Sequence, residues 1–449
     1  MSRFENAGTS PRNFGSIDVA EGIFSGSGTL QRIMDVEAAL AKVEAALGII
    51  PQEAAREIQK KAHVQLLDEE SYEKYRKATG HSLMGLLRAF KEICENNAGQ
   101  YIHYGTTTQD INDTAIILQM RDTLDLAEKK LVRLAKTIRE MAVRHRSTVM
   151  IGRTNDQQAL PITLGYKFAM WLDELLRDLD RIRSCRPRIL VGQFGGAVGT
   201  MDSLGEIGLS VRDGLMAELN IGVSPIAWYT SRDRYAEYTS ILSILCCTLG
   251  KLGNEVYIGQ KTEVNELAEG FDPEKIGSST MPHKRNPFVP AKLAGFGRMA
   301  RSITADSLLV MEGTNERDTR CLRVEPYFLE RISTLTDAAL DTAIDLFGHL
   351  EIRTEEMEKN LHCLGGLIYS EALMMELSKS LGRMEAHDRI HTLAQKAMKT
   401  ASSFIELLLN DEIVSKHLTK DEILKIMNPR NHIGLAEHFV DVVTSRVIE

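Results

Sequence analysis

Apolar residues recur every seven positions through a long stretch of the chain around residue 130. Two interleaved series share this spacing: Leu124, Leu131 and Ile138, and Ala127, Leu134 and Met141. Seven residues are close to two helical turns, so both series fall on one continuous stripe. The pattern predicts a long helix in a bundle whose helices run nearly parallel.

Two further stretches show helical periodicity. They predict one helix from Leu164 to Arg183 and another from about Arg234 to Leu267. The residues expected to face inward on these helices are Trp171, Leu172, Leu175, Leu176, Leu179 and Ile182, and Ile241, Leu242, Leu245, Leu249 and Val256. The second helix would be longer than one small domain needs. We therefore expect a bundle that continues across the subunits of an oligomer.

Proline placement supports a mostly helical chain. Proline is absent from 52–160, 226–272 and 327–428, and these intervals are rich in strong helix formers such as Ala, Leu, Glu and Lys. Strand-like alternation with turn pairs is scarce. The sequence predicts an all-α protein, with breaks between its helices at 153–161, 186–205, 222–232 and 271–290.

Composition and charge narrow the functional classes. The chain has 449 residues, of which 43% are hydrophobic and 26% charged, and its net charge is −8. These values are typical of a soluble globular protein with two or three domains, and the negative charge argues against a nucleic acid partner. We expect no signal peptide and no membrane span, because no apolar stretch has the necessary length.

The six cysteines lack the spacing of metal ligands. Cys246 and Cys247 lie in an apolar run, where small buried thiols are expected. Buried thiols of this kind indicate a reducing, cytoplasmic location.

The run from Gly277 to Pro287, GSSTMPHKRNP, carries the most chemistry. It combines hydroxyls, an imidazole, two cations and an amide with a glycine and two prolines, which favours a mobile loop that closes on an anion. No Asp or Glu occurs from Ile276 to Ala305, although five cations do: Lys284, Arg285, Lys292, Arg298 and Arg301. An island of positive potential in an acidic chain suits a polyanionic small substrate. The alternative is a solvated basic loop, but the ordered mix of residue types favours the first interpretation.

Other polar clusters lie in or beside the predicted breaks. Thr106, Thr107 and Thr108 follow a glycine at the expected start of a helix, where they could form a carboxylate cradle or simply cap the helix. Residues 152–158 are dense in amides. The segment 230–234 offers two arginines, one of which Asp233 could neutralise. His81 follows Gly80 at another helix start, and a lone histidine there is more often structural.

Several kinds of site are not indicated. The chain has no HExxH metal motif and no nucleophile elbow, and the glycine-rich GQFGGAVG lacks the strand and the Lys-Ser/Thr pair of a phosphate loop. We therefore expect neither a metal nor a cofactor. The chemistry would come from hydroxyls, imidazole, amides and cations acting together.

The run at Gly277 resembles the fumarate lyase signature G-S-S-x-M-P-x-K-x-N of the aspartase/fumarase superfamily. Other stretches match in order along nearly the whole chain. HYGTTTQDINDT and GRTNDQQALPITLG resemble the first and second carboxylate-binding segments of the superfamily. SRDRYAEY, GLIYSEA and NPRNHIGLA resemble the branch that holds adenylosuccinate lyase and carboxymuconate cycloisomerase, and RPRILVGQFGGAVGT is similar to the cycloisomerases in particular.

The resemblance implies an all-α, three-domain fold with a central bundle of long helices shared across a homotetramer. The implied domains are 1–110, a bundle at 111–360 that carries the signature loop, and 361–449. The resemblance also implies four active sites, each built from three subunits, and no cofactor. The substrate would be a small anionic di- or tricarboxylate, and the reaction a β-elimination that usually releases fumarate.

The resemblance further implies roles for individual residues. Ser278 would be the base that removes the proton, and His81 is the second catalytic candidate. The implied substrate-binding residues are Thr107, Thr108, Asn155, Gln157, Arg232, Ser279, Met281, Lys284 and Asn286. Removal of a proton beside a carboxylate produces a dianionic intermediate. Fixed cations and N–H donors must therefore stabilise its negative charge. Serine is a weak base at its ordinary pKa, so loop closure and desolvation would have to alter it.

One departure from the family pattern bears on the leaving group. Asn155 occupies the motif position where many members carry a histidine that acts as general acid or positions one. An amide cannot donate a proton at neutral pH, and positioned acid catalysis is worth about 10²–10⁴-fold in rate. Either another residue, with His81 as the candidate, donates the proton, or the leaving group departs unaided. The carboxylate of a lactone, or a thiolate, would leave readily.

Other departures argue against a nucleotide substrate. Adenylosuccinate lyases begin with an Arg-Tyr pair implicated in holding the phosphate, where this chain has Asn13-Phe14-Gly15. Their later Ser-Ser-x-Glu-Arg segment is replaced by the residues from Cys321 to Glu325. Cycloisomerases also lack the motif histidine, but Asn155-Asp156 does not match them closely either.

Four functions follow in order of preference. The first is a lyase that releases fumarate from a non-nucleotide succinyl adduct. The second is 3-carboxy-cis,cis-muconate cycloisomerase, which forms a lactone by the reverse of elimination, and the third is adenylosuccinate lyase. The fourth, from a different class, is a catalytically silent structural relative such as the lens crystallins of the superfamily.

Overall fold

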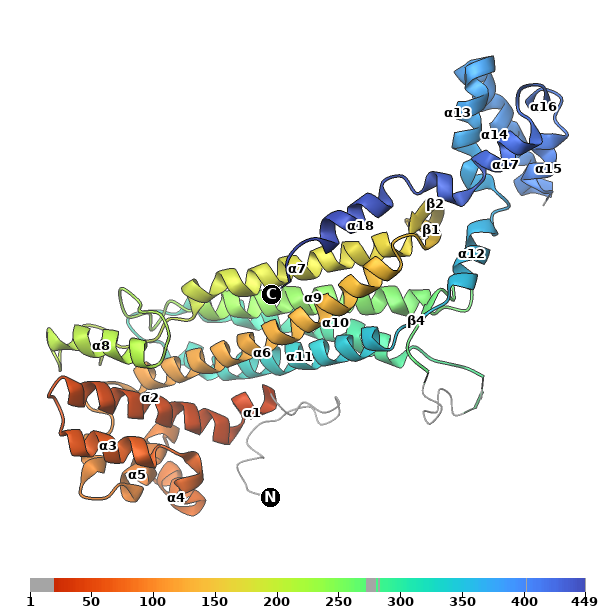
Figure 1. Ribbon diagram of the computed structural model, residues 1–449. Helices are drawn as coiled ribbons and strands as arrows, with labels where there is room; N and C mark the ends of the chain where they lie inside the picture. The colour runs from red at the N-terminus through yellow and green to blue at the C-terminus, as the bar shows by residue number, and fades with distance from the viewer. Residues whose placement is uncertain (1–19, 272–279, 282, 401, 449) are drawn as a thin grey trace. The chain divides into compact units, whose positions relative to one another are not determined.

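The computed structural model describes residues 20–271, 280–281, 283–400 and 402–448. Over these residues the chain is helical apart from turns and two small antiparallel sheets (Figure 1). One sheet pairs β1 (Val149–Thr154) with β2 (Gln157–Thr163), and the other pairs β3 (Leu267–Ala268) with β4 (Glu351–Ile352). The all-α prediction is confirmed.

The chain forms two compact units, each drawn from three segments. Unit 1 comprises Met1–Leu131, Asp178–Lys251 and Leu293–Thr342, and unit 2 comprises Val132–Arg177, Leu252–Lys292 and Ala343–Glu449. The predicted domain boundaries at 110 and 360 come from the family resemblance and stay a prediction.

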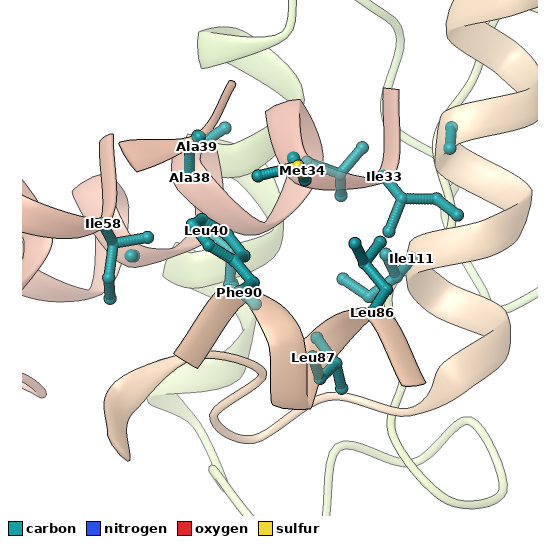
Figure 2. Packing of buried hydrophobic residues seen from close by; sticks show 14 of the residues in the cluster. Ile33, Met34, Ala38, Ala39, Leu40, Ile58, Leu86, Leu87, Phe90 and Ile111 are labelled. Atoms are coloured by element: carbon teal, nitrogen blue, oxygen red, sulfur yellow. The ribbon is translucent and has the colours of Figure 1, made fainter. Parts of the chain in front are cut away.

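The N-terminal part of unit 1 is a group of shorter helices. These are α1 (Ala20–Phe24), α2 (Gly26–Ala46), α3 (Gln52–Lys61), α4 (Glu69–Thr79) and α5 (Ser82–Ile93), with short 3-10 helices η2 (Val64–Leu66) and η3 (Ala98–Tyr101). Ser25 caps α2, because its Oγ accepts the Gly28 N–H at 2.9 Å. Apolar side chains of α2, α3 and α5 meet in one core that also receives the start of α6 (Thr108–Arg144), as Figure 2 shows around Leu40, Phe90 and Ile111.

Longer helices form the rest of unit 1. They are the unit 1 portions of α6, α7 (Leu164–Ile189), α9 (Asp233–Gly259), α10 (Phe288–Leu309) and α11 (Thr319–Gly348), joined by the shorter α8 (Ile207–Glu218) and η4 (Val310–Glu312). Buried hydrogen bonds tie these helices together. The Tyr238 hydroxyl on α9 lies 2.7 Å from Ser333 Oγ on α11, and Ser243 Oγ on α9 donates to the Ala300 carbonyl on α10 at 3.1 Å.

Unit 2 contains both sheets and the C-terminal helices. Besides its portions of the long helices, it holds α12 (Thr354–His362), α13 (Ser370–Leu381), α14 (Arg383–Thr400), α15 (Phe404–Leu409), α16 (Val414–His417), α17 (Lys420–Ile426) and α18 (Ala436–Thr444), with η5 (Leu367–Tyr369) and η6 (Pro429–His432). Helices α13 to α17 share a second apolar core that includes Leu373, Ile390 and Phe404.

The predicted apolar stripes are confirmed. Every residue predicted to face inward on the three long helices is buried, because each apolar stripe is covered by neighbouring elements. All six cysteines are free thiols. Cys246 is buried as predicted, whereas Cys247 is only half-buried.

Three local predictions are wrong in their boundaries. The segment 153–161 is not only a break, because most of it forms the hairpin of β1 and β2. Helix α7 continues through Pro187 to Ile189, where the burial of Cys185 and Ile189 outweighs the missing backbone N–H of proline. Helix α9 ends at Gly259 rather than at Leu267. The chain turns back there, and the Glu266 N–H donates to the Gly259 carbonyl at 2.9 Å.

Helix α9 is long and apolar enough, by length and composition alone, to cross a membrane. It is the one such helix among the residues that the structure describes. More than half (61%) of its most apolar window is buried inside the protein, as expected for the core helix of a bundle.

Candidate active site

Four donors converge on the carboxylate of Asp110 near the start of α6. Thr106 Oγ1 and the Thr107 N–H each donate to Oδ2 at 3.1 Å, and the Gly196 N–H donates to the same oxygen at 3.0 Å. The Tyr229 hydroxyl lies 2.6 Å from Oδ1. Asp110 is 1% exposed, and this burial raises its pKa against the lowering effect of the hydrogen bonds. One carboxylate thus holds together the start of α6, the glycine-rich loop and the segment before α9.

The start of α6 explains this convergence locally. Thr107 precedes the first helical residue, Thr108, so Asp110 stands at the third helical position. A carboxylate there accepts the backbone N–H of the capping residue, which is one half of a capping box. The predicted helix start at the threonines is therefore correct. The Thr107 hydroxyl is left for another partner.

That partner is Arg317, in the loop before α11. Its Nη1 donates to Thr107 Oγ1 at 3.2 Å, and its Nη2 donates to the Ala197 carbonyl at 3.0 Å. The guanidinium also lies over the ring of Tyr229, 5.0 Å from its centroid. Arg317 is exposed, and no carboxylate among the described residues pairs with it. The sequence pattern did not single it out. In the sequence it stands between Glu316 and Asp318, and only the structure shows that Asp318 pairs with Arg320.

Arg232, predicted to bind substrate, is inside unit 1. It is 1% exposed. Its Nη1 and Nη2 donate to the two oxygens of Asp113 at 2.9 Å each, and its Nε donates to Glu325 at 2.7 Å. Burial raises the pKa of the Glu325 carboxyl, which shares the cation with Asp113. Direct contact between Arg232 and a substrate would require these ion pairs to open, so this arrangement favours a structural role.

His81 forms the cap of α5. Helix α4 before it ends at Thr79 and is capped by Gly80, whose φ of +64° suits glycine, and His81 Nδ1 accepts the Met84 N–H at 3.4 Å. The imidazole is exposed. The structural interpretation of this histidine is thus supported, while Nε2 has no hydrogen-bond partner among the described residues.

In unit 2, Asn155 and Asp156 form the tip of the β1–β2 hairpin. Their φ angles are +52° and +61°, and Thr154 pairs with Gln157 across the turn, which is the pattern of a type I′ turn. Asn155 and Gln157 are both exposed at this tip. Asn and Asp tolerate positive φ better than most residues, so the turn left a signal in the sequence.

The strand before the tip is anchored through Arg153. Its guanidinium donates to both carboxylate oxygens of Glu266, at 2.8 and 2.7 Å. Asn360 Nδ2 donates to the same carboxylate at 2.8 Å. Because the strand is fixed next to the turn in this way, the exposed tip is presented at a defined place in unit 2.

The signature loop is described only in part. The predicted base Ser278 and its neighbour Ser279 lie outside the described residues. Lys284 is exposed, and its backbone N–H donates to the Met281 carbonyl at 3.0 Å. Met281 is also exposed, and Asn286 is half-buried. The described end of the loop therefore presents one lysine side chain to solvent.

The predicted site residues fall into two groups, one in each unit. His81, Thr107, Thr108 and Arg232 belong to unit 1, and Asn155, Gln157, Met281, Lys284 and Asn286 belong to unit 2. Among the residues that the structure describes, no cluster of three or more His, Cys, Asp or Glu side chains could hold a metal ion.

Comparisons with known proteins show which proteins the chain is similar to. Residues 13–300 match the family model described as lyase, and residues 366–443 match the model described as adenylosuccinate lyase C-terminus. The chain is 40% identical to adenylosuccinate lyase of Methanocaldococcus jannaschii, over 92% of this chain and 90% of the relative. It is 38% identical to N-acetyl-S-(2-succino)cysteine lyase of Dickeya dadantii, over 96% and 94%. A crystal structure of 3-carboxy-cis,cis-muconate lactonizing enzyme from Pseudomonas putida superposes with a TM-score of 0.89 at 33% identity, covering 95% of this chain and 96% of that one.

Proposed function

Because the chain belongs to the fumarate lyase superfamily and is a lyase, we propose that it cleaves a succinyl thioether to fumarate and a thiol without a cofactor. The observation that carries this proposal is Asn155, an amide on an exposed hairpin tip at the motif position where many members carry histidine. A thiolate, with a pKa of about 8.5, departs without a positioned acid, whereas an amine does not. The relative from Dickeya dadantii is named for cleavage of such a thioether.

The proposed reaction balances as a simple elimination. Ser278 takes a proton from the carbon that lies between a carboxylate and the carbon bearing sulfur. The carbon–sulfur bond then breaks, sulfur leaves as a thiolate with the electron pair, and the carbon–carbon double bond of fumarate forms. Ser278 then returns the proton that it took to solvent, and solvent protonates the thiolate where the pH requires it, so that the base is restored.

Two groups of residues would stabilise the negative charge of the dianionic intermediate. Thr107 and the exposed Arg317 guanidinium offer a hydroxyl and a cation to one carboxylate of the succinyl group. Lys284 and Asn286 are assigned to a carboxylate by their motif positions. Preorganised donors of this kind lower the barrier to forming the dianionic intermediate. The resemblance implies that a homotetramer completes each site.

A nucleotide substrate is disfavoured by the segment that replaces Ser-Ser-x-Glu-Arg. Within it, Cys321 is buried, and Glu325 is 1% exposed and paired with Arg232. A buried carboxylate cannot bind a phosphate. The other departure, at Asn13-Phe14-Gly15, lies outside the described residues. Adenylosuccinate lyase remains a candidate through its 40% identical relative, and the cycloisomerase through the similar Pseudomonas putida fold.

Three substrates separate these functions. The purified protein would be incubated with N-acetyl-S-(2-succino)cysteine, adenylosuccinate and 3-carboxy-cis,cis-muconate, and fumarate and free thiol would be quantified. We expect fumarate and thiol in equal amounts from the first substrate only. Turnover of the muconate without fumarate chemistry would replace this proposal by the cycloisomerase, and turnover of adenylosuccinate alone by the nucleotide lyase. If no substrate of any class reacts and Ser278→Ala changes nothing, the silent structural relative is favoured.

A further inference from the structure

We infer that Asp110 and Tyr229 are positioning residues that hold Thr107 and Arg317 ready for the substrate carboxylate. This inference rests on the proposed function for the identity of the ligand. Neither Asp110 nor Tyr229 would touch the substrate, because both are buried, at 1% and 4% exposure. They act through the hydrogen bonds that join three segments of unit 1.

Tyr229 connects the carboxylate to the glycine-rich loop. Its hydroxyl lies 2.6 Å from Asp110 Oδ1 and 2.8 Å from the Gly196 carbonyl oxygen. The hydroxyl has one proton, and the charged carboxylate is the stronger acceptor. Burial and the adjacent Asp110 raise the pKa of Tyr229, so the hydroxyl stays protonated and remains a donor. The Gly196 carbonyl can then accept from Arg317 Nη2, which lies 3.4 Å away.

Arg317 rests on the same three segments. Thr107 Oγ1, the Ala197 carbonyl and the ring face of Tyr229 each contact its guanidinium. All of these partners are uncharged, so the contacts orient the cation without neutralising it. An oriented guanidinium that still carries its full charge is suited to bind a carboxylate.

The glycine-rich loop is shaped around Tyr229. Gly196 has a φ of +76°, which a residue with a side chain rarely adopts, and this conformation aims its N–H at Asp110. A Cβ atom on Gly195 would lie 3.0 Å from the Tyr229 hydroxyl oxygen and 2.9 Å from Gly199 Cα. The close approach of loop and hydroxyl therefore depends on two successive glycines.

Removing the Tyr229 hydroxyl should weaken binding more than chemistry. In Tyr229→Phe, the ring face stays under Arg317, but the hydroxyl's contacts with Asp110 Oδ1 and the Gly196 carbonyl are lost, so that only the Gly196 N–H still ties the loop to the carboxylate. The substrate would then have to order Arg317 and the loop itself. We expect KM for the succinyl thioether to rise about 3- to 10-fold, with kcat within about 2-fold, because the ordering of one side chain and a short loop is worth about that much in affinity.

Tyr238→Phe is the matched control. Tyr238 is also a buried tyrosine of unit 1, and its hydroxyl lies 2.7 Å from Ser333 Oγ, a neutral partner on α11. Both variants delete one buried hydroxyl from the full-length protein, so both should lose some thermal stability. Only Tyr229→Phe should raise KM. Equal KM values for the two variants would overturn the inference.

A second readout does not depend on activity. Amide hydrogen exchange at Thr107 and Gly196 would be compared in the wild type, Asp110→Asn, Tyr229→Phe and Tyr238→Phe. We expect faster exchange at both amides in the first two variants and no change in Tyr238→Phe, because both N–H groups donate to Asp110. The amide oxygen of Asn is a weaker acceptor than a carboxylate, so unchanged exchange in both Asp110→Asn and Tyr229→Phe would contradict the positioning role. If the wild type cleaved no succinyl adduct, the proposed function would fail while this readout still decided the inference.

Discussion

Lys284 and Arg285 are neighbours in the chain but have opposite environments. The Arg285 guanidinium lies 2.8 Å from the Glu351 carboxylate and also donates to the Glu269 carbonyl at 3.0 Å. The Lys284 side chain is exposed and has no ion-pair partner among the described residues. One cation therefore anchors the signature loop, and the other remains available to an anion.

This difference predicts distinct effects of removing each charge. Lys284→Gln should lower kcat/KM by at least about 10²-fold, because it removes a cation that meets the charge of the intermediate. Its unfolding midpoint should stay near the wild-type value. Arg285→Gln breaks a half-exposed ion pair and should lower the free energy of unfolding by about 1 kcal/mol or less. Steady-state kinetics and urea unfolding of both variants would check this, and equal kcat/KM values would contradict the role of Lys284.

His81 can be tested without disturbing its helix cap. Asn accepts a helix N–H as well as any capping residue, so His81→Asn keeps the cap of α5 and removes only the imidazole. With a thioether substrate we expect kcat to change less than about 3-fold, because the thiolate needs no acid. A loss of about 10²-fold or more would instead identify His81 as the proton donor.

Asn155→His restores the histidine that many family members carry. Histidine tolerates the positive φ of this turn better than most residues, so the hairpin should form. We expect no more than about 3-fold change in kcat/KM for the thioether. An increase of about 10²-fold would show that the reaction needs a general acid that the wild type lacks. That result would contradict a thiolate leaving group, which departs without an acid. The matched kinetic control is Asp156→Asn, at the other position of the same turn.

Arg232 should matter for folding rather than for substrate affinity. Arg232→Gln would leave the buried carboxylates of Asp113 and Glu325 facing each other without a cation. Breaking a buried pair by removing one partner costs about 3–5 kcal/mol. Arg188→Gln, which removes an exposed partner of Glu237, should cost less than about 1 kcal/mol. Urea unfolding would measure both. A raised KM with unchanged stability in Arg232→Gln would support direct substrate binding instead.

Glu44 predicts a loss of stability as the pH rises. Burial first, and the nearby Glu37 second, raise the pKa of Glu44 to about 8, and neither of its carboxyl oxygens has a hydrogen-bond partner in the described residues. The folded state therefore keeps the proton, while the unfolded state releases it near the ordinary value of 4.5. The stability contribution is present below pH 4.5 and is lost as the pH rises towards 8, by up to about 1.4 kcal/mol per pH unit.

Glu44→Met should flatten this dependence. Methionine has a similar length and no charge, so we expect it to be more stable than the wild type at pH 8 by one or more kcal/mol. Exposed Glu53→Gln on α3 should leave the curve unchanged. Thermal unfolding between pH 5 and 8 would measure all three proteins, and parallel curves for the wild type and Glu44→Met would contradict the assignment.

Local patterns in the sequence predicted much of the helical framework. The stripe from Leu124 to Met141 is buried, and α5 and α6 begin at His81 and the threonines as predicted. These features follow from periodicity and capping, which depend on residues within a few turns of each other. The hairpin at Asn155 was missed because an amide-rich segment was taken for a loop, although its turn pair is a local signal.

The sequence by itself therefore determined the all-α class, the buried faces of the three long helices and the concentration of positive charge at 276–305, since each depends on neighbouring residues. Only the tertiary structure decided which polar groups meet. Asp110 binds Gly196, 86 residues away, and Tyr229, 119 residues away, and Arg317 reaches Thr107 across 210 residues. The same is true of Arg232, which the family resemblance assigned to substrate binding and whose ion pairs place it inside the protein. Long-range hydrogen bonds and ion pairs, and the burial of the polar groups that form them, are properties of the folded chain, so no local pattern can encode them.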